Sequence, residues 1–239
     1  MNAGATFQRA MDIAFAEEKD IFLVIYLDDV TIYSKTYLDH MRHLRHIFTK
    51  CRRFGISLNP KKSMFALSWG KFLGHVVSKE GISIDPKRVA TIKRLEYPRS
   101  KKEVQSFLGR VNFLRRFISN FAENVKVITN MLRKENQIFW TTEAKVSFNQ
   151  IKEFISRAPV LVSLDFSKDF YVFSFASDFT IVGVLLHKNE EGYKQPISFF
   201  SRALRDAELN YSVMEKQDYA MVQSLLGLYY SFSHYCICT

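Results

Sequence analysis

FLVIYLDDVTIYS, residues 22–34, is the stretch around which the rest of the sequence is organised. β-Branched and aromatic residues lie on both sides of Asp28-Asp29, which predicts two short strands joined by a hairpin turn with the acids near its tip. Carboxylates between apolar strands are unfavourable unless they are solvated, paired or neutralised by a cation. Asp is also a favoured residue of hairpin turns, so the dipeptide alone is better explained by turn geometry.

Helical and strand patterns surround this hairpin. Apolar residues recur at helical spacing over residues 5–17 and 37–54, and Gly55 is placed to end the second of these helices. Short strand-like segments follow at residues 56–58, 64–67 and 72–77. The first third of the chain is therefore expected to mix helices with short strands.

The pattern becomes helical after Asp85-Pro86, where Asp suits a helix cap and Pro the first helical position. Ser100 and Glu103 form a capping box, and apolar residues from Val104 to Ile118 follow the i, i+3, i+4 pattern. A further helix is predicted over residues 143–157. The last part predicts an α/β arrangement of three strands and a helix that begins near Ser212, the strands covering residues 171–176, 181–187 and 196–202.

Composition limits the class of protein. Of 239 residues, 47% are apolar and 24% are charged, which excludes a disordered, collagenous or low-complexity chain. No run approaches the ~18 uninterrupted apolar residues of a membrane-spanning helix, and no secretory signal follows Met1. The three cysteines are too few for a disulfide framework. An intracellular protein without a membrane partner is expected.

The excess positive charge is concentrated in one block. Residues 86–157 hold sixteen Lys or Arg against six Asp or Glu, whereas the two signs balance over the rest of the chain. Such a block attracts polyanions, of which nucleic acid is the commonest in a cell. A solvated helical surface that is rich in lysine explains the same counts.

The acidic hairpin resembles a known motif when its neighbours are considered with it. YLDDVTIYS, residues 26–34, is similar to the Tyr-x-Asp-Asp motif of reverse transcriptases. Residues 2–8, NAGATFQ, resemble the NAPATFQ segment of gypsy-type LTR retrotransposons, with Gly4 where proline is usual. Further matches follow in the family's order over the whole chain: His43-Leu44, Leu58-Asn59, Lys62, FLGH (72–75), SFLGRVNFLRRFI (106–118), PISFFSRAL (196–204) and NYSVMEK (210–216).

The resemblance implies roles for particular residues. Asp28 and Asp29 would hold Mg²⁺ for two-metal nucleotidyl transfer. Lys62, or Lys61, would neutralise the leaving pyrophosphate. The turn that places the primer 3′ hydroxyl would consist of Phe72, Leu73, Gly74 and His75.

The basic block would grip the phosphates of a template–primer duplex. Arg115 and Arg116 are the preferred contacts, because they follow the apolar stripe of the best-defined helix and match an Arg pair of the family. Snorkelling over the apolar face of their own helix would make the same two residues structural.

Three departures from the family pattern are expected to abolish activity. The third polymerase carboxylate belongs to a strand upstream of the NAPATFQ segment, and this chain begins at Met1. Phe175 stands at the metal-binding position of the RNase H motif TDASD, here SFASD, and Asp178 is interpreted as a turn residue. The chain stops at Thr239, before the later carboxylates. Glu215 matches a family catalytic residue, and it also forms a capping box with Ser212 that favours a structural role.

The sequence therefore predicts an α+β to α/β chain in three parts. Residues 1–85 would be the C-terminal part of a polymerase palm, residues 86–158 a helical thumb and connection, and residues 159–239 a truncated RNase H-like domain. The expected function is that of a retrotransposon reverse transcriptase fragment, inactive by itself. Its expected partners are an RNA/DNA template–primer duplex, dNTPs and the remainder of a polyprotein. A catalytically silent nucleic-acid-binding relic and a translation product without a function are the alternatives.

Overall fold

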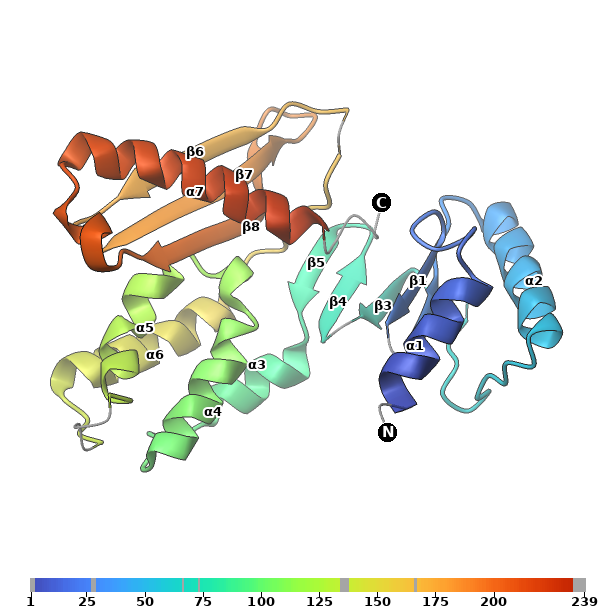
Figure 1. Cartoon of the computed structure of the whole chain (residues 1–239), viewed down its shortest axis with the longest axis horizontal. Helices are drawn as coiled ribbons and strands as arrows, with labels where there is room; N and C mark the ends of the chain where they lie inside the picture. The colour runs from blue at the N-terminus through green and yellow to red at the C-terminus, as the bar shows by residue number, and fades with distance from the viewer. Residues whose placement is uncertain are drawn as a thin grey trace. The chain divides into compact units, whose positions relative to one another are not determined.

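The computed structural model describes residues 3–26, 29–65, 67–72, 74–133, 138–165 and 167–233. The chain divides into two compact units, Met1–Leu67 and Ser68–Ser231. Both units mix helices with antiparallel strands, and Figure 1 follows them along the chain. The predicted boundaries at 85 and 158 both lie inside the second unit, so the division into three parts stays a prediction.

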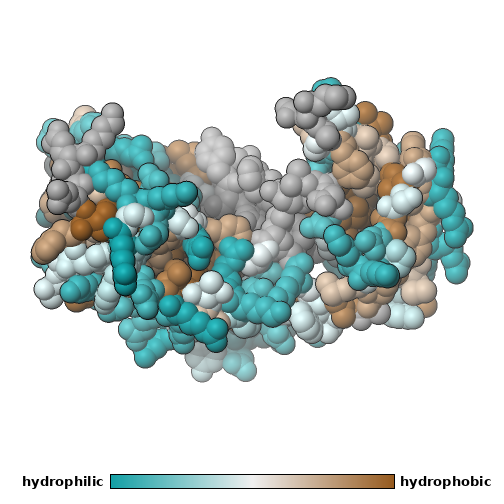
Figure 2. All heavy atoms as spheres, turned by 90° about the horizontal axis from the view of Figure 1, so that it is seen from below, coloured by the Kyte–Doolittle hydropathy of each residue, from teal (hydrophilic) through white to brown (hydrophobic). Residues whose placement is uncertain are grey.

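The first unit packs two helices against a two-stranded hairpin. Its elements are α1 (Ala3–Ala14), β1 (Leu23–Tyr26), β2 (Asp29–Ile32) and α2 (Tyr37–Arg53). The Thr36 hydroxyl caps α2 by accepting a hydrogen bond from the Asp39 amide at 3.2 Å. The buried core of this unit comes from α1, β1 and α2, and Val30 and Ile32 of β2 pack against it. It consists of Met11, Ala14, Phe15, Leu23, Ile25, Ile47 and Cys51. In Figure 2, hydrophilic side chains line the outer edge of this unit beside hydrophobic ones, as an amphipathic α2 requires.

The segment after α2 differs from the prediction. The strands predicted at 56–58 and 64–67 are wrong, because the described residues of both ranges are irregular. Gly55 has φ +65°, and the Asn59 side chain accepts a hydrogen bond from the Lys61 amide at 3.0 Å, so the chain turns instead of extending.

The second unit begins with an antiparallel sheet of order β3–β4–β5, comprising β3 (Trp69–Phe72), β4 (His75–Ser78) and β5 (Gly81–Ile84). The single strand predicted over residues 72–77 is wrong, because the chain reverses between Phe72 and His75, which face each other across a tight turn. Beyond this sheet, Ile82 and Leu161 exchange two backbone hydrogen bonds of 2.7 and 2.8 Å. This bridge ties β5 to a segment almost eighty residues later.

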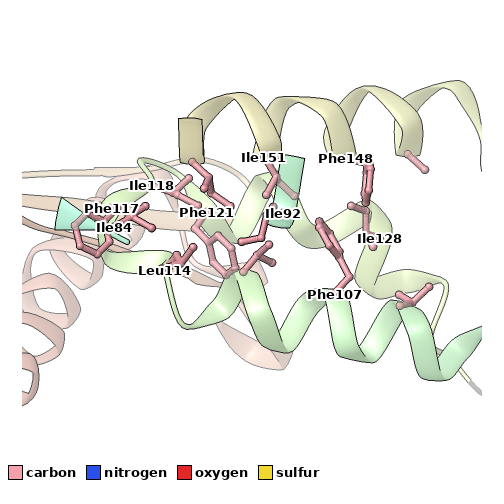
Figure 3. Close-up of a cluster of buried hydrophobic side chains, with 14 of the residues drawn as sticks. Ile84, Ile92, Phe107, Leu114, Phe117, Ile118, Phe121, Ile128, Phe148 and Ile151 are labelled. Carbon is pink, nitrogen blue, oxygen red and sulfur yellow. The ribbon is translucent and has the colours of Figure 1, made fainter. Parts of the chain in front are cut away.

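Four α-helices and a 3-10 turn follow: α3 (Pro86–Lys93), α4 (Lys101–Asn112), η1 (Arg115–Phe117), α5 (Phe121–Asn130) and α6 (Thr142–Ser156). The predicted N-caps are present, since Asp85 accepts from the Lys87 amide and Ser100 from the Glu103 amide. The reciprocal half of the predicted capping box is displaced by one residue, because the Glu103 carboxylate accepts from the Arg99 amide and not from that of Ser100. Helix α6 confirms the helix predicted over residues 143–157. Figure 3 shows how side chains of α3, α4, α5 and α6 meet in one core, among them Ile92, Phe107, Ile128, Phe148 and Ile151.

The amphipathic pattern predicted to run on to Ile118 is interrupted in the structure. Helix α4 ends at Asn112, and Arg115–Phe117 form a separate 3-10 turn. This break leaves Phe113 partly exposed beside β4, while Leu114 and Phe117 enter the core. Burial of two large side chains compensates for the lost helical hydrogen bonds.

The second unit ends with an antiparallel sheet of order β6–β7–β8, made of β6 (Tyr171–Ala176), β7 (Thr180–Lys188) and β8 (Lys194–Ala203). After the 3-10 turn η2 (Asp206–Asn210), helix α7 (Val213–Ser233) crosses one face of this sheet (Figure 1). The approach is close, because a Cβ on Gly183 would lie 2.3 Å from the Ser224 hydroxyl oxygen. The predicted strands and last helix are confirmed. Among the helices of the described ranges, none combines the length and apolar character needed to cross a bilayer.

Candidate nucleic-acid site

The acidic hairpin has the predicted geometry where the structure describes it. Tyr26 pairs with Asp29 across the two strands, so the loop between them has two residues. Asp29 opens β2 with an exposed side chain, whereas Leu23, Val24 and Ile25 on β1 are buried. Asp28 lies outside the described residues. A buried strand thus holds the exposed Asp29 carboxylate at the tip of the hairpin.

A buried carboxylate lies at the base of this hairpin. Glu18 is 2% exposed, and its backbone oxygen accepts hydrogen bonds from the amides of three residues leading into β1: Ile21, Phe22 and Leu23. Its carboxylate contacts Lys50 Nζ and His46 Nε2 of α2, both at 2.6 Å. Although burial opposes ionisation, these hydrogen bonds hold the pKa of Glu18 below its ordinary value. These contacts of Glu18 with Lys50 and His46 therefore fix α2 against the start of β1.

Lys62 is exposed in the loop after α2, and its backbone amide donates to Asn59 at 3.1 Å. Lys61, the alternative residue for this role, is exposed beside it, and its amide donates to the Asn59 side chain. The predicted role of Lys62 at a leaving group stays a prediction.

The predicted FLGH turn joins β3 to β4 and packs against the helices. Gly74 has φ +77°, and a Cβ there would lie 2.7 Å from Arg88 Nη2 and 3.3 Å from the Phe113 ring. His75 is 2% exposed, and its ring stacks on Phe113 with centroids 4.7 Å apart. The Phe72 side chain and all of Leu73 lie outside what the structure describes.

Two arginines complete this layer of rings. Phe113 is the C-cap residue of α4, and Arg88 Cζ of α3 lies 4.3 Å from the centroid of its ring. Arg116 Cζ of η1 lies 5.9 Å from the centroid of the Phe117 ring. Burial, and then the positive charges of Arg116 and Arg88, lower the pKa of His75 to about 4. Neutral His75 thus anchors the turn against the helices. Gly74, which precedes His75 in the turn, is half-buried.

This burial predicts a pH dependence of stability. An unfolded His binds a proton near pH 6.5, whereas folded His75 does so only near pH 4, so protons bind preferentially to the unfolded chain between these values. Lowering the pH from 7.5 to 4.5 should reduce the free energy of unfolding of the second unit by roughly 2–3 kcal/mol through this group. Both tryptophans, Trp69 and Trp140, lie in this unit, so urea melts followed by their fluorescence measure it.

The His75→Phe variant is the control, because it keeps the ring stack and removes the titration. The loss in free energy of unfolding between pH 7.5 and 4.5 should be smaller in this variant by roughly 2–3 kcal/mol. Equal losses in both proteins would show that His75 is not responsible.

The two predicted arginines have different surroundings. Arg115 is exposed, whereas Arg116 is partly buried beside Phe117 and His75. Lys71 of β3 forms a 2.6 Å ion pair with Asp85, whose pKa is lowered by that hydrogen bond. Exposed basic residues lie on β3 and on the elements that pack against the FLGH turn, namely Lys71, Lys87, Arg110 and Arg115.

In the described part of the chain, the positions matched to the RNase H site lie in different surroundings. Phe175 on β6 is 58% exposed, and Asp178 lies at the bend between β6 and β7. Glu215 accepts a hydrogen bond from the Ser212 amide at 2.7 Å and donates its own amide to the Ser212 hydroxyl. These bonds confirm the capping box and lower the pKa of Glu215. Over the described ranges, no group of three or more His, Cys, Asp or Glu side chains could hold a metal ion.

Sequence reasoning missed two residues of these sites. Arg88 matters because Gly74 lacks a side chain and lets the guanidinium approach. Glu18 is buried although it belongs to a polar stretch, AEEKD, that has the appearance of a solvated loop. Neither residue has a local sequence signal, because each is defined by a partner far along the chain.

Comparison with protein families divides the chain into two matched regions. Residues 1–77 match the reverse transcriptase (RNA-dependent DNA polymerase) family. Residues 140–236 match the RNase H-like domain found in reverse transcriptase.

Curated relatives include two polyproteins of the fission yeast Schizosaccharomyces pombe. The Transposon Tf2-3 polyprotein is 31% identical and the Transposon Tf2-7 polyprotein 30% identical, each over 223 residues, or 93% of this chain. The match covers 17% of each polyprotein, so the chain spans about one sixth of their length.

Similar solved structures come from foamy virus. The protease–reverse transcriptase dRH in complex with double-stranded DNA has a TM-score of 0.82 at 26% identity, and covers 95% of this chain and 40% of that one. The protease–reverse transcriptase in complex with an RNA/DNA hybrid has a TM-score of 0.80, also at 26% identity, over 95% of this chain and 31% of that one. The mixed α/β fold described above is shared with these structures.

Proposed function

We propose that this chain, in which a reverse transcriptase segment is followed by an RNase H-like domain, is part of a retrotransposon RNA-directed DNA polymerase and binds a template–primer duplex. The observation that carries the proposal is the anchoring of the FLGH turn on the basic helices through the Arg88, Phe113 and His75 stack. A turn held in this way can present a primer end rigidly to a site. The gypsy-type origin is supported by the Tf2 relatives.

Asp28 and Asp29 are proposed to hold Mg²⁺ at the hairpin tip. Asp29 fits this role, because its carboxylate is exposed and hard oxygen ligands suit Mg²⁺. When bound, Mg²⁺ would neutralise the charge of the reacting phosphates of dNTPs. The chain's own contribution is to fix the carboxylate position through buried β1 and to offer Lys62 as a cation near the leaving group.

The second matched region does not fit a nuclease metal site. Phe175 has no ligand atom, and Glu215 is engaged in the cap of α7. No cleavage step is therefore assigned to these residues. The alternative function, a catalytically silent nucleic-acid-binding relic, is favoured by this phenylalanine. The two functions share duplex binding and differ in primer extension.

Arg115 is expected to contact a backbone phosphate of the duplex, because it is exposed and adjoins Arg116, whose charge acts on buried His75. The Arg115→Ala variant should bind a labelled duplex several-fold more weakly. Its plot of log affinity against log salt should be shallower by about one, since one fewer counterion is released. Fluorescence anisotropy titrations at several salt concentrations measure both quantities.

Lys168→Ala removes an exposed lysine from the loop before β6 and is the matched control, expected to leave both quantities unchanged. An Arg115→Ala variant that keeps the affinity and slope of the unmodified chain would exclude this phosphate contact. Absence of any salt-dependent duplex binding by the unmodified chain would contradict the proposed function itself.

A further inference from the structure

Four aromatic side chains lie exposed or half-buried along one edge of the β6–β7–β8 sheet. Tyr171, Phe173 and Phe175 alternate along β6, and Phe179 follows in the β6–β7 turn; these four residues are called the aromatic row. Phe173 is 48% exposed, Phe175 58% and Phe179 51%. Because strand residues two apart point to the same side of a sheet, the three β6 rings share one face. Large exposed aromatic groups of this kind mark an interaction surface.

The packing of the second unit explains why this row is uncovered. Helix α7 covers the opposite face, where Ala176 and Ala220 are buried together. On the face of the aromatic row, α5 contacts β8, where the Ala122 amide donates to the Ser201 hydroxyl, and the start of β7, where the Thr180 hydroxyl donates to Glu123. Phe199 of β8 accordingly packs against the helical core. The β6 half of the same face is left to solvent.

Three lysines lie over rings of the row. Lys188 Nζ lies 4.6 Å from the Tyr171 centroid, and Lys194 Nζ lies 4.3 Å from that of Phe173. Lys126 Nζ of α5 lies 3.6 Å from the Phe179 centroid. These residues, called the ring lysines, come from three different elements. Each aromatic ring except that of Phe175 therefore has an ammonium group within reach.

An apolar protein partner would have to strip water from all three ammonium groups, which is costly without opposite charge. A single strand of nucleic acid satisfies both features, because its bases stack on aromatic rings and its phosphates pair with cations. Rings two residues apart on a strand lie about 7 Å apart, and sheets with aromatic rows stack two or three unpaired bases in this way. A duplex, whose base faces are already stacked, cannot use the rings.

We propose that the aromatic row and the ring lysines form a site for single-stranded nucleic acid, distinct from the FLGH turn and Arg115 that are assigned to the duplex. Bases stack on Phe173 and Phe175, and the ring lysines swing from the rings to the phosphates. Phe175 thus has a binding role at the position where the RNase H motif has its metal-binding aspartate. The site does not depend on polymerase activity, and it reads no sequence because every base has a stacking face.

The test measures the binding of a fluorescein-labelled oligothymidylate of about 15 nucleotides, a length within the range that single-strand-binding domains occupy. Stacking contributes about 1–3 kcal/mol per base, so the Phe173→Ala/Phe175→Ala variant, which loses two stacking rings, should bind the strand at least about 30-fold more weakly. Phe173→Trp/Phe175→Trp, which keeps stacking rings, should bind as tightly as the unmodified chain. Phe139→Ala, at a ring that is 73% exposed elsewhere, is the control and should have no effect.

Lys188→Ala/Lys194→Ala should reduce the salt slope of strand binding by about 1.4, at roughly 0.7 per phosphate. The Phe173→Ala/Phe175→Ala variant should bind the duplex as tightly as the unmodified chain does. Duplex binding therefore tests the proposed function, and single-strand binding tests the aromatic row, independently of each other. Unchanged strand binding in that double variant would overturn the site. Loss of a dimer in the same variant, seen by light scattering, would instead assign the row to contact between two copies of this chain.

Discussion

Gly81→Ala is expected to destabilise the second unit by about 4 kcal/mol or more, the largest effect predicted for a single methyl group in this chain. Gly81 has φ +132°, a conformation almost restricted to glycine. Another residue held there is strained by about 1–3 kcal/mol. An added Cβ would lie 2.2 Å from the backbone oxygen of Leu161, which cannot rotate away as a side chain could. Relief of the clash breaks the two backbone hydrogen bonds between Ile82 and Leu161, each worth about 1–3 kcal/mol when a buried group is left unpaired.

Gly109→Ala is the matched control. Gly109 lies within α4, and a Cβ there would meet no atom within 4 Å. Alanine should therefore raise stability by about 0.5–1 kcal/mol through its helix propensity. Urea melts followed by tryptophan fluorescence measure both variants. If the Gly81→Ala protein unfolded at the same urea concentration as the unmodified chain, the bridge to Leu161 would not contribute to the stability of the second unit.

The elements with strong local signals could be predicted from the sequence. Helix α6 has a cap at Thr141 and apolar residues at helical spacing, and β6, β7 and β8 are rich in β-branched and aromatic residues. The break of α4 at Asn112 could not be predicted, because Phe113 leaves the helical pattern to stack on His75, almost forty residues earlier. The link between Ile82 and Leu161 depends on tertiary packing in the same way.

The candidate site was predictable in its residue types and less so in their surroundings. The hairpin that presents Asp29 follows from the apolar residues on both sides of the acids. The burial of His75 does not, because histidine is polar and its neighbours Gly74 and Val76 indicate only a turn and a strand. Arg115 and Arg116, adjacent in sequence, differ in exposure because the 3-10 turn directs one of them toward the core.

Lys50→Met is expected to destabilise the first unit by about 3 kcal/mol at neutral pH. Breaking a buried ion pair leaves an uncompensated charge, and such losses are about 3–5 kcal/mol. His46 keeps one hydrogen bond to Glu18, which places the expected value at the lower end. The first unit has no tryptophan, so amide hydrogen exchange in β1 and β2 measures its opening, while tryptophan fluorescence of the second unit should not change.

Two comparisons identify the buried carboxylate as the cause. Arg45→Met removes an exposed cation from the same helix and should have little effect. Glu18→Gln combined with Lys50→Met removes both charges and should recover most of the stability. If the double variant were as unstable as Lys50→Met alone, lost packing of the lysine stem would explain the effect instead.

The pH dependence of this difference follows from the pKa of Glu18, which lies below its ordinary value of 4.5 in the folded chain. A carboxyl with a lowered pKa contributes stability that is complete above the unfolded pKa and is lost as the pH falls through the folded pKa. Removing Lys50 deletes part of that contribution. The stability gap between Lys50→Met and the unmodified chain should therefore be full at pH 7 and narrow below pH 4.5, as Glu18 becomes protonated in both proteins. A gap that stayed constant to acidic pH would mean that Lys50 acts through packing and not through its charge.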